Sequence, residues 1–236
     1  MIRRIIAFFK RAYYSSNSER YCNYLRKKGI LIGTGTHIDP QTSLIDTSRP
    51  SLIQIGDNCY MNNNFTLLTH DWVTNVFINT KRMFINSSGK VCIGNNVSFG
   101  QNVMVLKGVT IGDNCFIGAG SIVTKDIPAN TIAVGAPCKV VMTLEEYYQK
   151  RLVKNEEEAF EYARSILERF NRIPNIYDFW EEFPLFIDGN KIEDYPEIKD
   201  IIKNQLGPIY EDYKQNHIAK YNGLNDFLKA AGVYEK

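Results

Sequence analysis

The sequence repeats a six-residue pattern through Ile93-Gly-Asn-Asn-Val97-Ser, Phe99-Gly-Gln-Asn-Val103-Met, Val105-Leu-Lys-Gly-Val109-Thr, Ile111-Gly-Asp-Asn-Cys115-Phe, Ile117-Gly-Ala-Gly-Ser121-Ile and Val123-Thr-Lys-Asp-Ile127-Pro. An apolar residue opens every unit, glycine follows it in four of the six, and a small or β-branched residue stands four places after each opener. A fixed period of this kind is interpreted first, because it decides the architecture.

A period of six predicts short parallel strands rather than an α-helix. An amphipathic helix repeats its apolar residues about every 3.6 positions, which a strict six does not match. Glycine and asparagine tolerate the positive φ of a tight turn, so each unit can form a short strand followed by a turn. Three units then close one triangular coil, and successive coils stack about 4.8 Å apart. The predicted fold is therefore an all-β core, a parallel β-helix of hexapeptide repeats.

The same pattern starts earlier in the chain. Openers are expected, in order, at Ile32, Ile38, Leu44, Ile55, Met61 and Leu67. Residues 45–54 interrupt the count by five residues. Cys59 and Cys115 take the small inward position of their units, so we expect both thiols in the core.

A long loop is predicted after His70. The next regular opener after Leu67 is Ile93, which comes twenty residues later than the repeat requires. Loops of this length are uncommon in compact folds and are usually functional. The chain should therefore leave the β-helix just after His70 and return through a loop at residues 71–92.

The register places His70 at a corner of the predicted prism. With the loop discounted, the units that open at residues 67, 105 and 123 stack in one column. His70 then lies one coil from Gly108, which leaves space beside the imidazole, and Lys107 and Lys125 stack in the neighbouring position. This arrangement provides a base, an opening and a cationic track.

Histidine suits general-base catalysis, because neutral imidazole can accept a proton from a hydroxyl group near neutral pH. We interpret His70 as the catalytic base, and His37 and His217 as ordinary surface or packed histidines. Asp71 could orient the imidazole. Neighbours in sequence rarely face each other, however, so a role for Asp71 in folding the loop is the preferred interpretation.

Composition excludes several classes of protein. The 236 residues carry a net charge of +2, which gives no reason to expect nucleic-acid binding. The five cysteines show neither a disulfide framework nor zinc spacing, so no metal is predicted and no oxidising compartment is required. The apolar run at residues 5–9 is too short for a signal peptide or a membrane span. We expect a cytoplasmic protein.

Residues 1–29 are predicted to form an N-terminal helical cap. One helical face carries Ile2, Ile5, Ile6, Phe9 and Tyr13. This face either covers the open end of the β-helix, which would otherwise expose an unpaired strand edge, or makes weak peripheral contact with an anionic membrane. The cap is the preferred interpretation.

The motifs over residues 30–141 resemble the left-handed β-helix acyltransferases. The resemblance rests on the hexapeptides, on Leu67-Leu-Thr-His70-Asp-Trp72, on the run from Ile117 through Thr124-Lys-Asp-Ile-Pro, and on Val134-Gly-Ala-Pro-Cys-Lys139. Within that superfamily the chain is most similar to sugar, capsular polysaccharide and xenobiotic O-acetyltransferases. The resemblance implies left-handed winding, a homotrimer with active sites between subunits, and direct transfer from acetyl-CoA to the acceptor without a metal.

The resemblance also implies roles for individual residues. His70 matches the histidine that deprotonates the acceptor hydroxyl. The coenzyme-binding candidates are Gln101 near the thioester, Ala119 beside the pantetheine arm, and Thr124, Lys125 and Lys139 at the nucleotide end. Relatives often carry a small polar residue where this chain has Gln101.

The acceptor site is expected beside the loop at residues 71–92. Trp72 either stacks on the face of a sugar ring or anchors the root of the loop. Asn63 either binds sugar hydroxyls or acts as an ordinary turn former. Asp71 completes the acceptor-site candidates.

The period changes to that of helices from residue 142. Thr143 and Glu146 predict an N-terminal capping box. The helical stripe that follows comprises Leu144, Tyr148, Leu152, Ala159, Ala163, Ile166, Leu167 and Phe170. Prolines divide the remainder, and shorter helices are expected at 176–183, 197–206 and 225–231. Residues 142–236 should pack as a C-terminal helical domain, whose role stays open between covering the β-helix, strengthening a trimer, shaping a polysaccharide site and binding a partner protein.

The sequence thus predicts an O-acetyltransferase that moves an acetyl group from acetyl-CoA to a hydroxyl of a carbohydrate, either a capsule or exopolysaccharide or its precursor. Acetylation of an antibiotic or other xenobiotic is an alternative with the same chemistry. A non-catalytic β-helix scaffold is an alternative of a different class. A histidine at the root of a long loop favours the enzyme.

Overall fold

The computed structural model describes residues 13–233 and comprises two compact units, Met1–Tyr148 and Gln149–Lys236. The helices and strands that begin in the first unit are α2 (Ser18–Lys27), β1 (Leu31–Ile32), β2 (His37–Ile38), β3 (Leu44–Ile45), β4 (Ile53–Ile55), β5 (Tyr60–Met61), β6 (Thr66–Leu67), α3 (Thr74–Lys81), β7 (Val91–Ile93), β8 (Ser98–Phe99), β9 (Met104–Val105), β10 (Thr110–Ile111), β11 (Phe116–Ile117), β12 (Ile122–Val123), β13 (Thr131–Val134), β14 (Lys139–Thr143) and α4 (Leu144–Phe170). A 3₁₀ turn, η1 (Pro50–Leu52), precedes β4.

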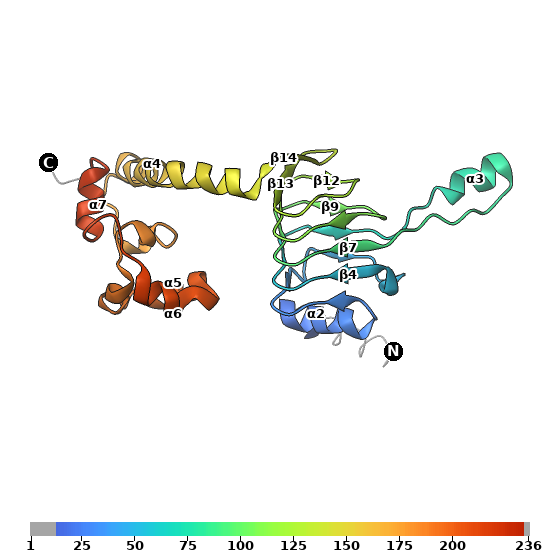
Figure 1. Ribbon diagram of the computed structural model, residues 1–236, viewed down its shortest axis with the longest axis horizontal. Helices are drawn as coiled ribbons and strands as arrows, with labels where there is room; N and C mark the ends of the chain where they lie inside the picture. Colours follow the sequence, from blue (N-terminus) through green and yellow to red (C-terminus); the bar gives the residue numbers. More distant parts are fainter. Residues whose placement is uncertain (1–12, 234–236) are drawn as a thin grey trace. The chain divides into compact units, whose positions relative to one another are not determined.

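Three parallel sheets form the walls of a triangular coil, which we call the prism (Figure 1). Sheet A has the order β1-β4-β7-β10, sheet B the order β2-β5-β8-β11-β13, and sheet C the order β3-β6-β9-β12. From β1 to β12, successive strands pass from A to B to C, so each of these coils adds one strand to every wall. β14 pairs with β13 in antiparallel orientation and ends sheet B.

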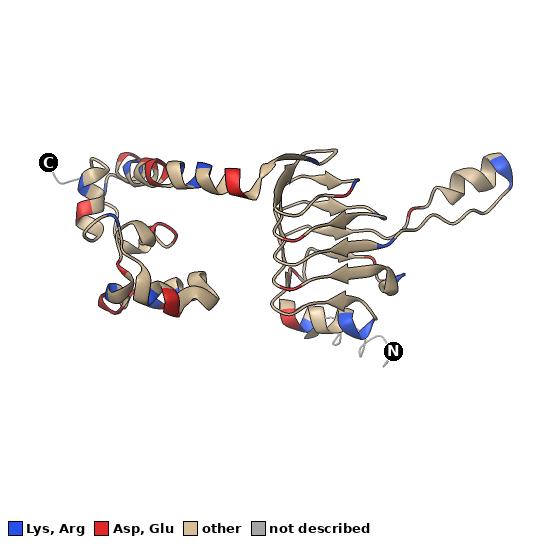
Figure 2. Cartoon of the chain, viewed as in Figure 1, with Lys and Arg blue, Asp and Glu red and all other residues tan. Residues whose placement is uncertain are grey.

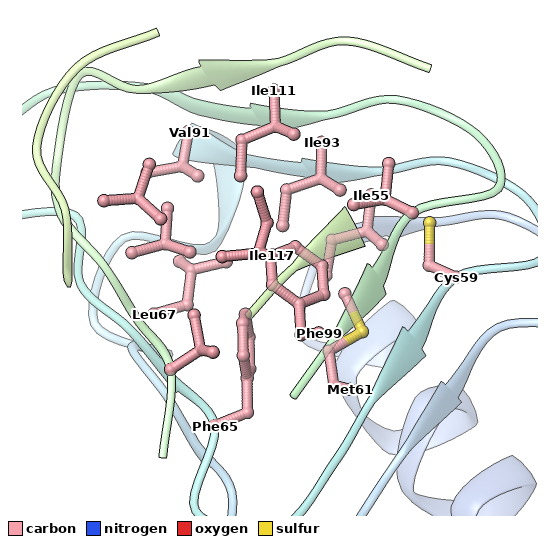
Figure 3. Packing of buried hydrophobic residues seen from close by; sticks show 14 of the residues in the cluster. Ile55, Cys59, Met61, Phe65, Leu67, Val91, Ile93, Phe99, Ile111 and Ile117 are labelled. Atoms are coloured by element: carbon pink, nitrogen blue, oxygen red, sulfur yellow. The ribbon is translucent and has the colours of Figure 1, made fainter. Parts of the chain in front are cut away.

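The strand register confirms the predicted columns. Leu67 pairs with Val105, and Val105 pairs with Val123. The openers point inward and fill the prism, where the Phe65 and Phe99 rings lie 4.9 Å apart (Figure 3). Both Cys59 and Cys115 are buried free thiols, as predicted.

The turns between strands use the residue types that the repeat supplies. Positive φ occurs at the fourth position of most units, at Gly35, Asn58, Asn64, Asn96, Asn102, Gly108, Asn114 and Gly120. Asparagine and glycine enter this region at the lowest steric cost. The period of six is therefore a strand plus a left-handed turn residue.

The third strand differs from the prediction. Leu44 is 54% exposed, whereas Ile45 is buried and pairs with Leu67. The turn before β3 is one residue longer than the repeat allows, because the Asp39 carboxylate accepts hydrogen bonds from the amide and hydroxyl of Thr42 and holds a wider loop. The inward position is thereby moved from Leu44 to Ile45.

Helix α2 covers the first coil. Cys22 and Leu25 are fully buried in the prism core. The Ser18 hydroxyl accepts a hydrogen bond from the Ile38 amide, and Arg26 donates to the carbonyl groups of Ile32 and Gly33. These contacts satisfy backbone groups at the open strand edge. The amphipathic face predicted from Ile2 to Phe9 lies outside the described residues, so its membrane contact stays a prediction.

The second unit is helical and has its own aromatic core. Its further elements are η2 (Ile176–Asp178), η3 (Phe183–Leu185), η4 (Gly189–Asp194), α5 (Lys199–Leu206), η5 (Gly207–Ile209), α6 (Tyr210–Asn216) and α7 (Leu224–Ala230). The rings of Phe179, Phe186 and Phe227 are buried against one another. No helix between residues 13 and 233 combines the length and apolar character that crossing a bilayer requires.

Helix α4 begins where the sequence predicted. The Glu146 carboxylate accepts a hydrogen bond from the Thr143 amide, and the Glu146 amide donates to the Thr143 hydroxyl, which completes the capping box. The predicted apolar stripe is only partly buried, however. Ala159, Ala163 and Ile166 are buried, whereas Tyr148 and Leu152 are exposed.

Two predictions in the second unit were wrong. Residues 176–183 do not form an α-helix, because the chain leaves helical geometry at Phe179 and turns that ring into the core. Helix α6 was missed, because Pro208 was interpreted as a helix breaker. Pro208 lies in the first turn of η5, where its missing N–H costs nothing, and α6 follows directly.

Candidate active site

His70 lies at the edge of the prism where sheet C turns into sheet A, which we call the C–A edge. A long arm that contains α3 leaves the prism here (Figure 1). The two strands of the arm meet in an antiparallel bridge between His70 and Ser88, with the Gly89 amide donating to the Thr69 carbonyl at 2.9 Å. The backbone at His70 is thus held in place by the residues through which the arm returns to the prism.

Asp46 orients the imidazole of His70. The Asp46 Oδ2 atom lies 2.6 Å from His70 Nδ1, and the carboxyl is only 8% exposed. The same carboxylate accepts hydrogen bonds from the amide and hydroxyl of Ser48 at 3.0 and 2.6 Å, and from the amide and hydroxyl of Thr69. Because an ionised carboxylate can only accept, Nδ1 carries the hydrogen, and Nε2 is left as the acceptor of the neutral ring.

The surroundings of Asp46 keep its carboxyl ionised. Burial alone would raise the pKa of Asp46, but the hydrogen bonds from Ser48, Thr69 and His70 outweigh it and hold the pKa well below its ordinary value. The carboxylate therefore stays charged through the whole range in which a histidine changes its protonation state.

Sequence reasoning missed Asp46. The residue lies in the segment 45–54, which was treated only as an interruption of the repeat. The interruption itself predicts a loop, because extra residues inserted at a prism corner must project outward. Here the loop brings Asp46 and Ser48 to the corner one coil below His70.

Asp71 folds the arm and does not contact the imidazole. Its carboxylate pairs with Lys107 at 2.6 Å and accepts hydrogen bonds from the Ser87 hydroxyl and the Val73 amide. The hydrogen bond from Lys107 is the main reason that the pKa of Asp71 is lowered to about 2. Lys107 also contacts Ser87, so one of the two lysines in the predicted cationic track is neutralised at the arm root.

A pocket of about 180 Å³ opens beside His70. It is lined by Ser48, Arg49, His70, Asp71, Trp72, Thr74, Phe84, Ile85, Asn86 and Ser87. The Trp72 ring is 66% exposed, and its centroid lies 6.0 Å from that of His70. One coil away, a Cβ atom on Gly108 would meet no atom within 4 Å, so that corner is open as predicted.

Two of the coenzyme-binding candidates share the edge of His70. Thr124 and Lys125 lie between Val123 in sheet C and Ile127, which forms a bridge to Ile111 in sheet A. Both side chains are exposed. Figure 2 shows basic residues at several levels of the edge from which the arm leaves.

The other candidates lie on a different edge, where sheet B turns into sheet C, which we call the B–C edge. Asn63 and Gln101 are stacked in its turns, since their carbonyl groups accept the amides of Asn102 and Gly120. Ala119 lies directly above Gly100 in the same stack. Lys139 pairs with Val134, whose side chain contacts Gly118. Sheet C separates these four residues from His70 within one chain.

No group of three or more His, Cys, Asp and Glu side chains is arranged to hold a metal ion within residues 13–233. The charged groups around His70 include the Asp46 carboxylate on the imidazole, the Asp71–Lys107 ion pair and the Arg49 guanidinium in the same pocket. That set suits proton transfer from a hydroxyl group.

A prism of six-residue repeats with a histidine at the root of an arm is typical of the hexapeptide-repeat transferases. A family model described as bacterial transferase hexapeptide (six repeats) matches residues 93–125. The galactoside O-acetyltransferase of Escherichia coli (strain K12) is 35% identical over 160 residues, which cover 58% of this chain and 77% of that protein. The chain therefore belongs to the hexapeptide-repeat acetyltransferases.

Solved structures that are similar to this chain include two sugar acetyltransferases. One is a maltose O-acetyltransferase from Clostridium difficile 630, with 28% identity, a TM-score of 0.42, and coverage of 59% of this chain and 85% of that one. The other is a galactoside acetyltransferase in complex with coenzyme A, with 25% identity, a TM-score of 0.38, and coverage of 60% and 80%.

Proposed function

We propose that this O-acetyltransferase moves an acetyl group from acetyl-CoA to a hydroxyl of a carbohydrate, with His70 as the general base. The observation that carries the proposal is the contact between Asp46 and His70 Nδ1 at the mouth of the arm pocket. It leaves Nε2 available to the pocket as a proton acceptor. The Escherichia coli relative is named for transfer to a galactoside, which supports a sugar acceptor.

The chemistry follows from which imidazole nitrogen carries the hydrogen atom: Nδ1–H donates to Asp46, so Nε2 can accept a proton. Acetyl-CoA supplies an acetyl group activated as a thioester. His70 Nε2 removes the proton of the acceptor hydroxyl while the hydroxyl oxygen bonds to the acetyl carbonyl carbon. The charge that forms on the imidazole is stabilised by Asp46. When the carbon–sulfur bond breaks, the imidazolium returns its proton to the departing thiolate, so the enzyme ends in its starting state.

The acceptor is proposed to be a sugar of a capsule, an exopolysaccharide or a precursor. The exposed rings of Trp72 and Phe84 support this, since both line the pocket and offer flat apolar surfaces for a sugar ring. Asp71 is proposed to hold the arm root rather than the sugar, because Lys107 and Ser87 contact its Oδ2 atom and the Val73 amide donates to Oδ1. Asn63 is proposed to contact the acceptor only from a neighbouring copy.

The test is an acceptor-dependent release of free thiol from acetyl-CoA. Galactosides, maltose, capsule fragments and an aminoglycoside would be compared, with the product identified by mass spectrometry. We expect an O-acetylated sugar. Product from the antibiotic alone would replace the carbohydrate with a xenobiotic, and no thiol release with any acceptor would contradict the proposed transfer.

We further propose a homotrimer with left-handed coils, in which the active site forms between two copies. The C–A edge of one copy, with His70, Thr124 and Lys125, would face the B–C edge of the next, with Gln101, Ala119 and Lys139. The separation of these two sets by sheet C within one chain supports the proposal. The arm also exposes Val76, Met83 and other apolar side chains that a second copy would cover.

Mixed assemblies of two inactive variants test this arrangement. His70→Ala removes the base, and Ala119→Trp blocks the opposite edge at an exposed position. Co-refolded chains should regain part of the activity, because some sites would combine an intact His70 with an intact Ala119. Light scattering should give about three times the chain mass. A trimer without recovered activity would place the whole site within one chain.

Lys125→Ala and Lys139→Ala are each expected to raise the KM for acetyl-CoA by roughly 3- to 30-fold, with little change in kcat, because each removes a cation from the phosphate end of the coenzyme. Initial rates at varied acetyl-CoA and saturating acceptor measure this. Lys27→Ala, an equal loss of charge on α2, is the control. A change confined to the KM of the acceptor would show that the coenzyme and acceptor sites have been exchanged.

A further inference from the structure

The pocket beside His70 contains a guanidinium group that its catalytic chemistry does not use. Arg49 lies in the loop that carries Asp46, between Ser48 and the 3₁₀ turn η1, and it lines the pocket together with His70. Its Nη2 atom donates to Asn86 Oδ1 on the returning strand of the arm at 3.1 Å. A prism loop and the arm thus jointly position this cation.

The acidic groups of the pocket are already engaged elsewhere. Asp46 accepts from His70, Thr69 and Ser48, and Asp71 is paired with Lys107. Within residues 13–233, Arg49 forms no ion pair with a carboxylate, and its one side-chain partner is the neutral amide of Asn86. Arg49 therefore places in the pocket a guanidinium that is not paired with a carboxylate of the described residues.

We propose that Arg49 selects an acceptor sugar that carries an anionic group, either a carboxylate or a phosphate, near the hydroxyl that His70 deprotonates. The inference rests on the proposed function and narrows its substrate class. A guanidinium presents five N–H donors, of which Asn86 engages one side. The remaining donors match the paired oxygen atoms of a carboxylate or phosphate in a bidentate contact.

The dimensions of the pocket agree with a single sugar unit. Its volume of about 180 Å³ equals that of about six water molecules at ~30 Å³ each, well below the ~300–1,000 Å³ of sites that enclose larger ligands. Trp72 and Phe84 offer ring faces in the same pocket. One ring of the acceptor would therefore contact Arg49, His70 and an aromatic side chain together, while neighbouring sugar units stay outside.

The experiment compares neutral and charged acceptors of the same configuration. Methyl glucoside and methyl glucuronide form one pair, methyl galactoside and methyl galacturonide a second, and glucose with glucose 1-phosphate a third. Arg49→Gln removes the charge and keeps a side chain that can donate to Asn86. Lys81→Gln, an equal loss of charge at the far end of α3, is the control.

The wild-type enzyme should have a kcat/KM about 10- to 100-fold higher for the charged member of at least one pair, as a charge-assisted hydrogen bond provides. Arg49→Gln should lose that factor on the charged acceptor and change less than about threefold on the neutral one. Lys81→Gln should behave as wild type. A preference for uronides over the phosphate identifies a carboxylate ligand, and the reverse identifies a phosphate.

Four outcomes would overturn the inference. Equal use of neutral and charged acceptors by the wild-type enzyme would leave Arg49 without a selective role. An equal loss by Arg49→Gln on both members would show that the arginine only holds the arm through Asn86. Absence of transfer to every sugar would refute the carbohydrate acceptor, and the inference with it, whereas transfer to neutral sugars alone would keep the proposed function and refute only the charge preference.

Discussion

Replacing His70 by alanine is expected to lower kcat by about 10²- to 10⁴-fold, because general-base catalysis supplies a factor of this size. The KM for acetyl-CoA should change little, since the coenzyme-binding candidates are other residues of the C–A and B–C edges. Thiol release at saturating acetyl-CoA and acceptor measures the effect. An affinity measurement with coenzyme A would show that the binding site persists.

The other two histidines provide matched controls. His37 stacks on the Tyr60 ring on the outer face of sheet B, at a centroid distance of 4.7 Å. His217 lies in the second unit, where Nε2 contacts the Pro184 carbonyl oxygen at 2.7 Å. His37→Ala and His217→Ala should therefore retain kcat within about threefold of wild type, far less than a lost general base costs. If His70→Ala were as active as these two variants, the assignment of the base would be wrong.

Asp46→Asn is expected to lower kcat by roughly 10- to 10⁴-fold, the span found when the partner of a functional histidine is changed. An amide at this position can donate to Nδ1, which favours the tautomer with hydrogen on Nε2 and removes the proton acceptor from the pocket. The KM for acetyl-CoA should be unchanged. This difference between kcat and KM distinguishes a positioning role from a general loss of folding.

Two variants complete the test of Asp46. Asp113→Asn makes the same change at a prism turn, where the carboxylate accepts hydrogen bonds from the backbone amide and the side-chain amide of Asn95, and should leave kcat nearly unchanged. Asp46→Glu should recover part of the activity, because a carboxylate is restored near Nδ1. If Asp46→Asn retained full kcat, the contact with His70 would be structural only.

Because the pKa of Asp46 is lowered, its contribution to the stability of the fold persists at mildly acidic pH. A carboxyl with a lowered folded pKa stabilises the fold above its ordinary titration range, and that contribution is lost only as the pH falls through the lowered value. Asp46 therefore stays ionised at mildly acidic pH. A loss of activity there is therefore not caused by protonation of the Asp46 carboxylate.

The sequence was sufficient for the prism because its rule is local. The period alone predicts the openers and the turn residues. It also predicts the column that contains Leu67, Val105 and Val123. The position of Asp46 does not follow from it, since an interruption of the repeat has no period to count. The shift from Leu44 to Ile45 was missed for the same reason, as it depends on the hydrogen bonds that Asp39 makes in the turn.

The site was predictable only where it follows the repeat. Register arithmetic placed His70 at a corner and gave open space at Gly108. It could not show that Lys107 is neutralised by Asp71, because the arm returns to the prism through contacts distant in sequence. Beyond α4 the second unit has no regular period, so proline positions were the main guide there, and these failed where Pro208 begins a helical turn.

The two ends of the prism are capped by different elements, and both caps limit end-to-end association of the molecule. At one end Ser18 and Arg26 occupy the backbone groups of the first coil, and at the other β14 reverses direction against β13. A solenoid with bare ends would accept another solenoid and polymerise into fibres. A proteolytic cut that released α2 would uncover such an end, so the helix protects the folded chain from end-to-end assembly.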